Sequence, residues 1–173
     1  MITLDAFFYI MFALFAIIGA LRGLKRELLV TAAGVMGVFT VEIVVPMVID
    51  DLSATQLFWT SLGVMGAFAI LAYQTPSFRR FVEIGLFERK VSHGMVFGGL
   101  VGAFNGYLYL STIFHYMAQA NYPVAQITPP DLATQAGQAA AQILSCAVPV
   151  HLQGTYIYVG IVVAFICIIG AFV

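Results

Sequence analysis

The chain has 173 residues, of which 62% are apolar and 9% charged, and its formal net charge is −1. Soluble domains carry about 25% charged residues, so this composition excludes an ordinary soluble globular protein and favours a membrane protein. The sequence also contains no basic patch of the kind that binds nucleic acid.

Five apolar segments are long enough to cross a membrane, because a helix needs roughly 20 apolar residues to span the hydrocarbon core. They cover residues 5–22, 28–48, 57–74, 91–117 and 153–173. The first begins with Asp5 and is followed by basic residues, so we interpret it as a retained span and not as a signal peptide. The sequence therefore predicts an all-α, polytopic transmembrane bundle that forms one domain over residues 1–173.

Lysine and arginine occur only in two short connections, after the first span and after the third. The seven residues are Arg22, Lys25, Arg26, Arg79, Arg80, Arg89 and Lys90. Short connections that are rich in these residues stay in the cytoplasm. We therefore expect the N-terminus outside and the C-terminus inside.

Two connections are predicted to contain surface helices. Residues 77–90 mix phenylalanines with arginines and glutamates, which is typical of a helix at the inner headgroup level, with a solvated loop as the alternative. The longest connection covers residues 118–152. In it Asp131 follows two prolines and precedes an alanine-rich run, so we expect an outer helix over residues 131–146 with Asp131 as its N-cap.

The fourth span contains glycines at a strict spacing of four, at Gly94, Gly98, Gly102 and Gly106. In water each would cost about 0.8–1 kcal/mol relative to alanine. In lipid, small residues let helix backbones approach closely, so the series predicts a groove that packs against another helix. The alternative is that glycine is simply common in membrane helices. The sequence leaves open whether the partner helix belongs to this chain or to another.

Residues 4–37 and the glycine motif carry a resemblance to a known family. The matching features are Asp5, the Arg22-Gly23 pair, the Arg26-Glu27 pair, Gly34 and the GMVFG motif at residues 94–98. In these features the chain resembles the colicin V production proteins over about residues 4–117. The resemblance implies a multi-span protein of the bacterial cytoplasmic (inner) membrane, linked to toxin export or envelope maintenance. The family's usual Asp-Arg pair before the glycine motif is replaced here by Lys90-Val91.

Glu42 is the acidic residue deep inside a predicted span, and Pro46 follows four residues later. Proline cannot donate the helical hydrogen bond to the Glu42 carbonyl, so a kink is expected there. Glu42 and Asn105 lie at about the same distance from the inner ends of their respective spans, so we expect them at the same depth. We therefore expect a Glu42–Asn105 contact, either as a proton or cation site or as a structural interhelical bond.

The three histidines are the candidate cofactor ligands. His93 and His115 are about 33 Å apart along one helix, so they cannot share a metal or haem. His115 and His151 are both expected on the outer side, and any of the three could ligate a pigment or haem shared with a partner subunit. Interfacial hydrogen bonding is the alternative for each. No cofactor or metal site of the chain itself is predicted.

No catalytic motif is apparent, so the sequence predicts a non-enzymatic membrane protein that acts as a packing or accessory subunit. Its expected partners are the lipid bilayer and, through the glycine groove, other membrane subunits or a second copy of the chain. The alternative is a small oligomeric transporter, channel or secretion component that uses Glu42 and Asn105.

Overall fold

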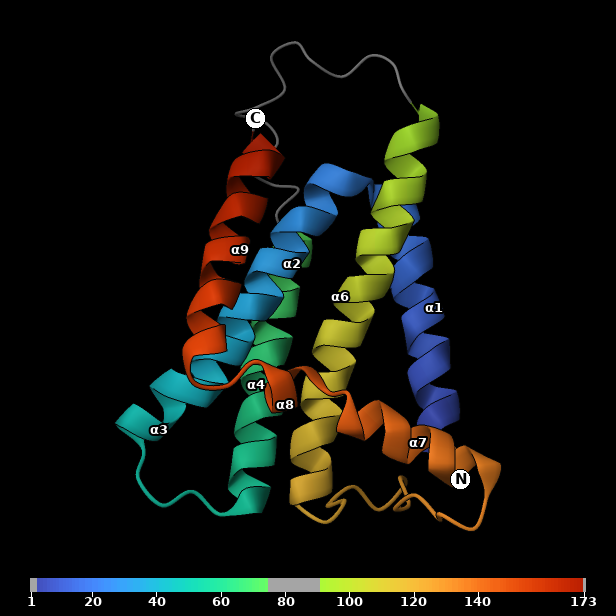
Figure 1. The fold of residues 1–173 in the computed structure, drawn as a ribbon, viewed down its shortest axis with the longest axis vertical. Helices are drawn as coiled ribbons and strands as arrows, with labels where there is room; N and C mark the ends of the chain where they lie inside the picture. Colours follow the sequence, from blue (N-terminus) through green and yellow to red (C-terminus); the bar gives the residue numbers. More distant parts are fainter. Residues whose placement is uncertain (1–2, 75–90, 173) are drawn as a thin grey trace.

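The computed structural model describes residues 3–74 and 91–172, which form helices and contain no strand (Figure 1). The long helices are α1 (Leu4–Arg22), α2 (Leu24–Phe39), α4 (Ala54–Gln74), α6 (Val91–Gln119) and α9 (Thr155–Phe172). Length and apolar composition allow four segments to cross a membrane, or five when α9 is counted with the bent segment before it. The predicted all-α, membrane-spanning class is confirmed. The predicted helix over residues 77–90 lies outside the described residues.

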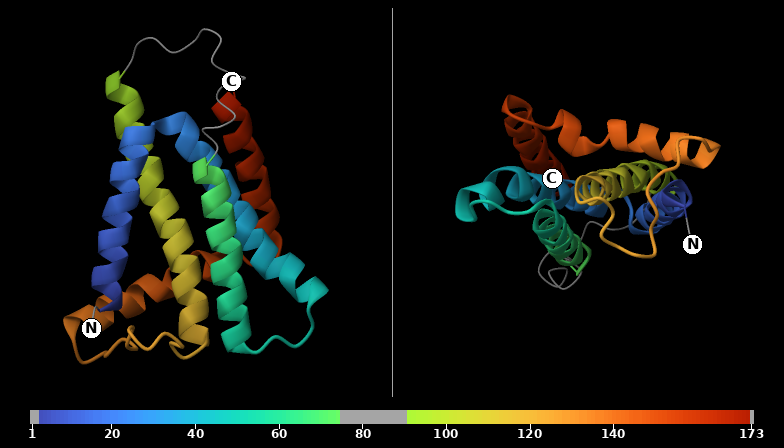
Figure 2. Two further views of the ribbon diagram at one scale, coloured as in Figure 1. Left: turned by 180° about the vertical axis from the view of Figure 1, so that it is seen from behind. Right: turned by 90° about the horizontal axis from the view of Figure 1, so that it is seen from below.

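Helix α6 lies between α1 and α2 (Figure 2). On the outside of this group, α9 packs against α2, and α4 packs against both α2 and α6. The start of α1 and the end of α9 lie at opposite ends of the bundle (Figure 1), as an odd number of crossings requires. We call the end that carries Arg22 the inner end and the opposite end the outer end, following the predicted orientation. Apolar side chains fill both halves: Phe8, Phe58 and Phe114 toward the outer end, and Val30, Met65 and Leu108 toward the inner end.

A single residue, Gly23, joins α1 to α2 at the inner end. Its φ of 81° lies in the region that glycine adopts without steric cost, and its backbone N–H donates to the Gly19 carbonyl oxygen at 2.9 Å. The chain can therefore reverse in one residue. Helix α2 begins almost at once, which brings its first turn, including Glu27, beside Arg22.

The second span is interrupted near its outer end. Helix α2 ends at Phe39, a π-helical turn η1 covers Thr40–Val44, and the short α3 (Val45–Val48) contains Pro46. The backbone N–H of Val45 donates to the Thr40 carbonyl oxygen, so the helix widens just before the proline. Helix α3 then leans out of the bundle (Figure 1), which agrees with the predicted kink.

The outer connection contains α7 (Gln135–Ser145) and the short α8 (Val148–His151). The predicted N-cap was wrong: Thr134 caps α7, and its hydroxyl accepts a hydrogen bond from the Gly137 N–H at 3.0 Å. Asp131 instead forms the preceding turn, because its carboxylate accepts from the Ala133 N–H at 3.0 Å. Helix α7 lies across the outer ends of α1 and α6 (Figure 1).

Candidate functional site

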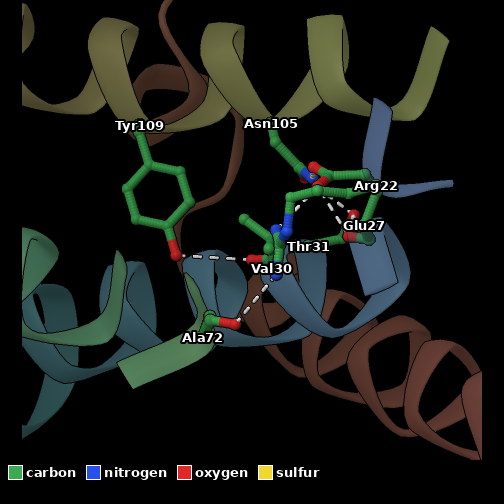
Figure 3. Close-up of polar contacts among 7 residues, drawn as sticks. All are labelled: Arg22, Glu27, Val30, Thr31, Ala72, Asn105 and Tyr109. Carbon is green, nitrogen blue, oxygen red and sulfur yellow. Dashed lines mark hydrogen bonds and ion pairs between the residues drawn. The ribbon is translucent and has the colours of Figure 1, made fainter. Parts of the chain in front are cut away.

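Four polar side chains gather where α1, α2 and α6 meet near the inner end, and we call Arg22, Glu27, Thr31 and Asn105 the polar cluster (Figure 3). Its central contact is an ion pair in which Arg22 Nη1 donates to Glu27 Oε1 at 2.7 Å. The Glu27 side chain is 0% exposed and that of Arg22 is 16% exposed. An ion pair shielded from water in this way depends on good geometry and further hydrogen bonds to offset its desolvation.

Asn105 of α6 supplies those further hydrogen bonds. Its Nδ2 atom donates to Glu27 Oε2 at 2.9 Å and to the Glu27 backbone carbonyl at 3.0 Å. Its Oδ1 atom accepts from the Thr31 hydroxyl at 2.7 Å. Asn105, Thr31 and Glu27 are all buried, so the amide uses its donor and its acceptor to join α6 to α2.

Contacts to a fourth helix extend the polar cluster toward α4. Arg22 Nη2 donates to the Ala72 carbonyl oxygen at 3.4 Å, and the guanidinium carbon lies 4.3 Å from the centre of the Tyr73 ring. A cation over an aromatic face is attracted by the ring's negative potential. On α6, the Tyr109 hydroxyl donates to the Val30 carbonyl oxygen at 3.3 Å (Figure 3). Four helices are thus tied together around one buried ion pair.

The sequence predicts no site at Arg22 or Glu27, because Arg22 ends the first predicted span and Glu27 directly precedes the second. Arg22 contributes to the predicted orientation, and both residues contribute to the family resemblance. The signal that could have found them is an arginine and a glutamate separated by a short segment that contains a glycine turn.

The predicted contact between Glu42 and Asn105 is absent. Glu42 Oε1 accepts a hydrogen bond from the Tyr116 hydroxyl, whereas Asn105 binds Glu27. Asn105 lies fourteen residues after the start of α6, but Glu27 lies three residues after the start of α2. Helix α6 therefore begins about 16 Å beyond the start of α2 at the inner end, and Figure 1 shows α6 extending past α2 there. Equal counts from the two helix ends therefore do not give equal depths.

Three of the four glycines in the predicted groove pack against α1 of the same chain. A Cβ atom on Gly98 or Gly102 would lie 2.8 Å from the Cα atom of Gly23 or Gly19, respectively. One on Gly106 would lie 2.9 Å from the Phe15 Cβ atom, but one on Gly94 would meet nothing within 4 Å. The helix that occupies the groove is therefore internal, and a partner protein would have to bind elsewhere.

The histidines do not come together as a ligand set in the described residues. His115 lies 2.8 Å from Gln119, nitrogen to nitrogen, and its ring contacts that of Tyr116. His151 is exposed at the end of α8, and the His93 side chain lies outside the described part. Within residues 3–74 and 91–172, no group of three His, Cys, Asp or Glu side chains is placed to hold a metal ion.

An apolar cavity of about 550 Å³ opens at the outer end, far from the polar cluster. It lies beside Leu4, Phe7 and Phe114, and residues 124–127 line its other side. None of the predicted site residues lines it.

Comparison with protein-family models, with curated proteins and with solved structures finds no match for this chain. Inference about its function therefore depends on the residues and their geometry.

Proposed function

We propose that the protein is a non-enzymatic accessory subunit of a larger membrane assembly and acts through packing, not through chemistry at its polar cluster. The proposal depends on one observation: the carboxylate of the polar cluster is fully paired and shielded from solvent. The Glu27 carboxylate has a donor on each oxygen, from Arg22 and from Asn105, and is 0% exposed. A carboxylate held in this way joins helices, and no substrate can approach it without displacing one of those donors.

We further propose that the chain is related to the colicin V production proteins and belongs in the bacterial cytoplasmic membrane. Four of the residues behind that resemblance have definite structural roles, which supports the proposal. Arg22 and Glu27 form the buried ion pair, Gly23 makes the one-residue turn, and Gly98 contacts α1. Each of these positions restricts which residue can replace it.

The geometry gives less support to a transporter that uses Glu42 and Asn105 together. Glu42 binds Tyr116, and eleven residues of α6, or about 16 Å, separate Tyr116 from Asn105. The two residues therefore belong to different halves of the bundle.

The experiment is gentle extraction of the affinity-tagged chain from its native membrane, followed by quantitative mass spectrometry of the proteins that remain bound. We expect the same partner chains in a fixed ratio to the tagged chain across independent preparations. An untagged strain controls for background. Recovery of the tagged chain alone, or with itself only, would contradict the accessory role.

A further inference from the structure

Glu42 differs from Glu27 in having no cation beside it among the residues that the structure describes. It lies in the π-helical turn of the second span and is half-buried, and the Tyr116 hydroxyl donates to its Oε1 atom. Within the described residues this is the one hydrogen bond that the structure shows to the Glu42 carboxyl group, and its Oε2 atom accepts none. An ionised carboxylate in a membrane span is costly unless a partner compensates its charge.

Among residues 3–74 and 91–172, no lysine or arginine is placed to provide this compensation. Helix α2 carries two basic residues, Lys25 and Arg26. Arg26 is the nearer to Glu42, and sixteen residues, or about 24 Å of helix, separate the two. Arg22 is already paired with Glu27. The remaining four basic residues belong to residues 75–90, which follow the inner end of α4 and precede that of α6. The long outer connection, residues 118–152, contains none.

The surface next to Glu42 is exposed and apolar. Pro46 follows Glu42 by four residues across the end of the π-helical turn, and Ile49 is the extended residue that ends α3. Both are exposed. Helix α3 leans out of the bundle here (Figure 1), and Met47 on it is 80% exposed. We call Glu42, Pro46 and Ile49 the Glu42 surface. It combines an acidic group with an apolar edge that projects from the bundle.

Building on the proposed accessory role, we propose that the Glu42 surface binds a transmembrane helix of a different protein, which carries a lysine or arginine in the outer half of the membrane. Charge complementarity selects this occupant. A second copy of the chain with the same orientation would bring its described basic residues, Arg22, Lys25 and Arg26, to the inner end, so none of these three could pair with Glu42. A basic residue of the partner would pair with the carboxylate while its apolar side chains cover Ile49 and α3.

Two variants separate the charge of Glu42 from its internal hydrogen bond. Glu42→Gln removes the charge but keeps an acceptor for Tyr116. Tyr116→Phe removes the donor but keeps the carboxylate. We expect Glu42→Gln to lower the amount of captured partner at least tenfold in the native-membrane experiment, and Tyr116→Phe to leave it within about twofold of wild type. Thermal unfolding of each purified variant shows whether the bundle itself remains intact.

Photo-crosslinking tests the same surface without altering Glu42. A photoreactive amino acid at Ile49 should crosslink to a protein with a lysine or arginine in the outer half of a span. The same amino acid at Ile17, an exposed position of α1, should not capture that protein. Equal capture by both positions, or crosslinks to lipid only, would overturn the proposal.

The outcomes distinguish this proposal from the accessory role on which it depends. If wild type and Glu42→Gln recover the same partners in equal amounts, the Glu42 surface is not the binding site but the accessory role stands. If the wild-type chain recovers no partner, both proposals fail. If Tyr116→Phe loses the partner and Glu42→Gln does not, the Glu42–Tyr116 pair acts inside the bundle and the charge pairing is refuted.

Discussion

Single residues decide how closely the helices approach at the inner end. Gly19, Gly98 and Gly102 let the backbones of α1 and α6 touch, and beside this contact Asn105 reaches the Glu27 carboxylate. In lipid, where apolar side chains gain little from leaving the solvent, close backbone contact and interhelical hydrogen bonds drive association. Loss of either should therefore be measurable as a loss of stability.

A substitution at Glu27 tests the buried ion pair. Glu27→Leu leaves the Arg22 guanidinium without its carboxylate, and we expect a loss of about 3–5 kcal/mol in the free energy of unfolding. Combining it with Arg22→Met removes the unpaired charge and should restore a large part of that loss. Both variants lose the hydrogen bond from Asn105 to the Glu27 carboxylate, so their difference isolates Arg22. Reversible unfolding in mixed micelles measures both, and a double variant no more stable than Glu27→Leu would refute this account of the pair.

Two glycines of one helix provide a matched test of the α1–α6 contact. Gly98→Ala would place a methyl group against Gly23, and we expect a loss of about 1–3 kcal/mol, typical of overpacking. Gly94→Ala meets open space and should be neutral or slightly stabilising, since alanine favours helix. Thermal unfolding in detergent compares the two. If the two variants change stability equally, the glycines of α6 do not contribute to stability through close packing against α1.

Among the secondary elements, the start of α7 is the clearest departure from sequence expectation. Thr134→Ala removes the hydroxyl that accepts from the Gly137 N–H, and an N-cap of this kind contributes about 1 kcal/mol. We expect amide exchange in the first turn of α7 to accelerate roughly fivefold, since 1.4 kcal/mol corresponds to a factor of ten. Asp131→Ala is the control and should affect mainly the Ala133 amide. If Asp131→Ala accelerates amide exchange in the first turn of α7 and Thr134→Ala does not, Asp131 is the N-cap and the assignment of Thr134 is wrong.

The spans could be predicted from the sequence because each is a long apolar run bounded by polar or turn residues. The predicted limits 5–22 and 57–74 compare with Leu4–Arg22 and Ala54–Gln74 in the structure. The kink at Pro46 could also be predicted from the sequence, because proline has no N–H to donate to the helix. These features depend on local chemistry alone.

The partners of the buried polar groups could not be predicted from the sequence. Asn105 was matched to Glu42 by counting from helix ends, but α6 extends past α2 at the inner end (Figure 1). Glu27 lies just before the predicted span 28–48, whereas α2 begins at Leu24 and its first turn buries Glu27. The offset of two helices along the bundle axis depends on tertiary packing, so it cannot be predicted from a local sequence pattern.

For the whole molecule, orientation can be tested with the natural cysteines. Cys146 is exposed near the outer end, whereas Cys167 is partly buried within α9. We expect a membrane-impermeant maleimide to label Cys146 in cells whose outer surface is accessible to the reagent, and Cys146→Ser to abolish this labelling. Lys25→Cys, at an exposed inner position, should react only after the membrane is permeabilised. The reverse pattern would invert the predicted topology.

We propose that this bundle functions as one part of a larger assembly, and the mass of the native particle tests this proposal most directly. The chain itself has a mass of 18.7 kDa. Extraction into polymer-bounded lipid discs, followed by native mass spectrometry, gives the protein mass of each particle without detergent. The account predicts one dominant mass that equals this chain plus a fixed set of different chains. A dominant mass equal to this chain, or to a whole-number multiple of it, would contradict the claim.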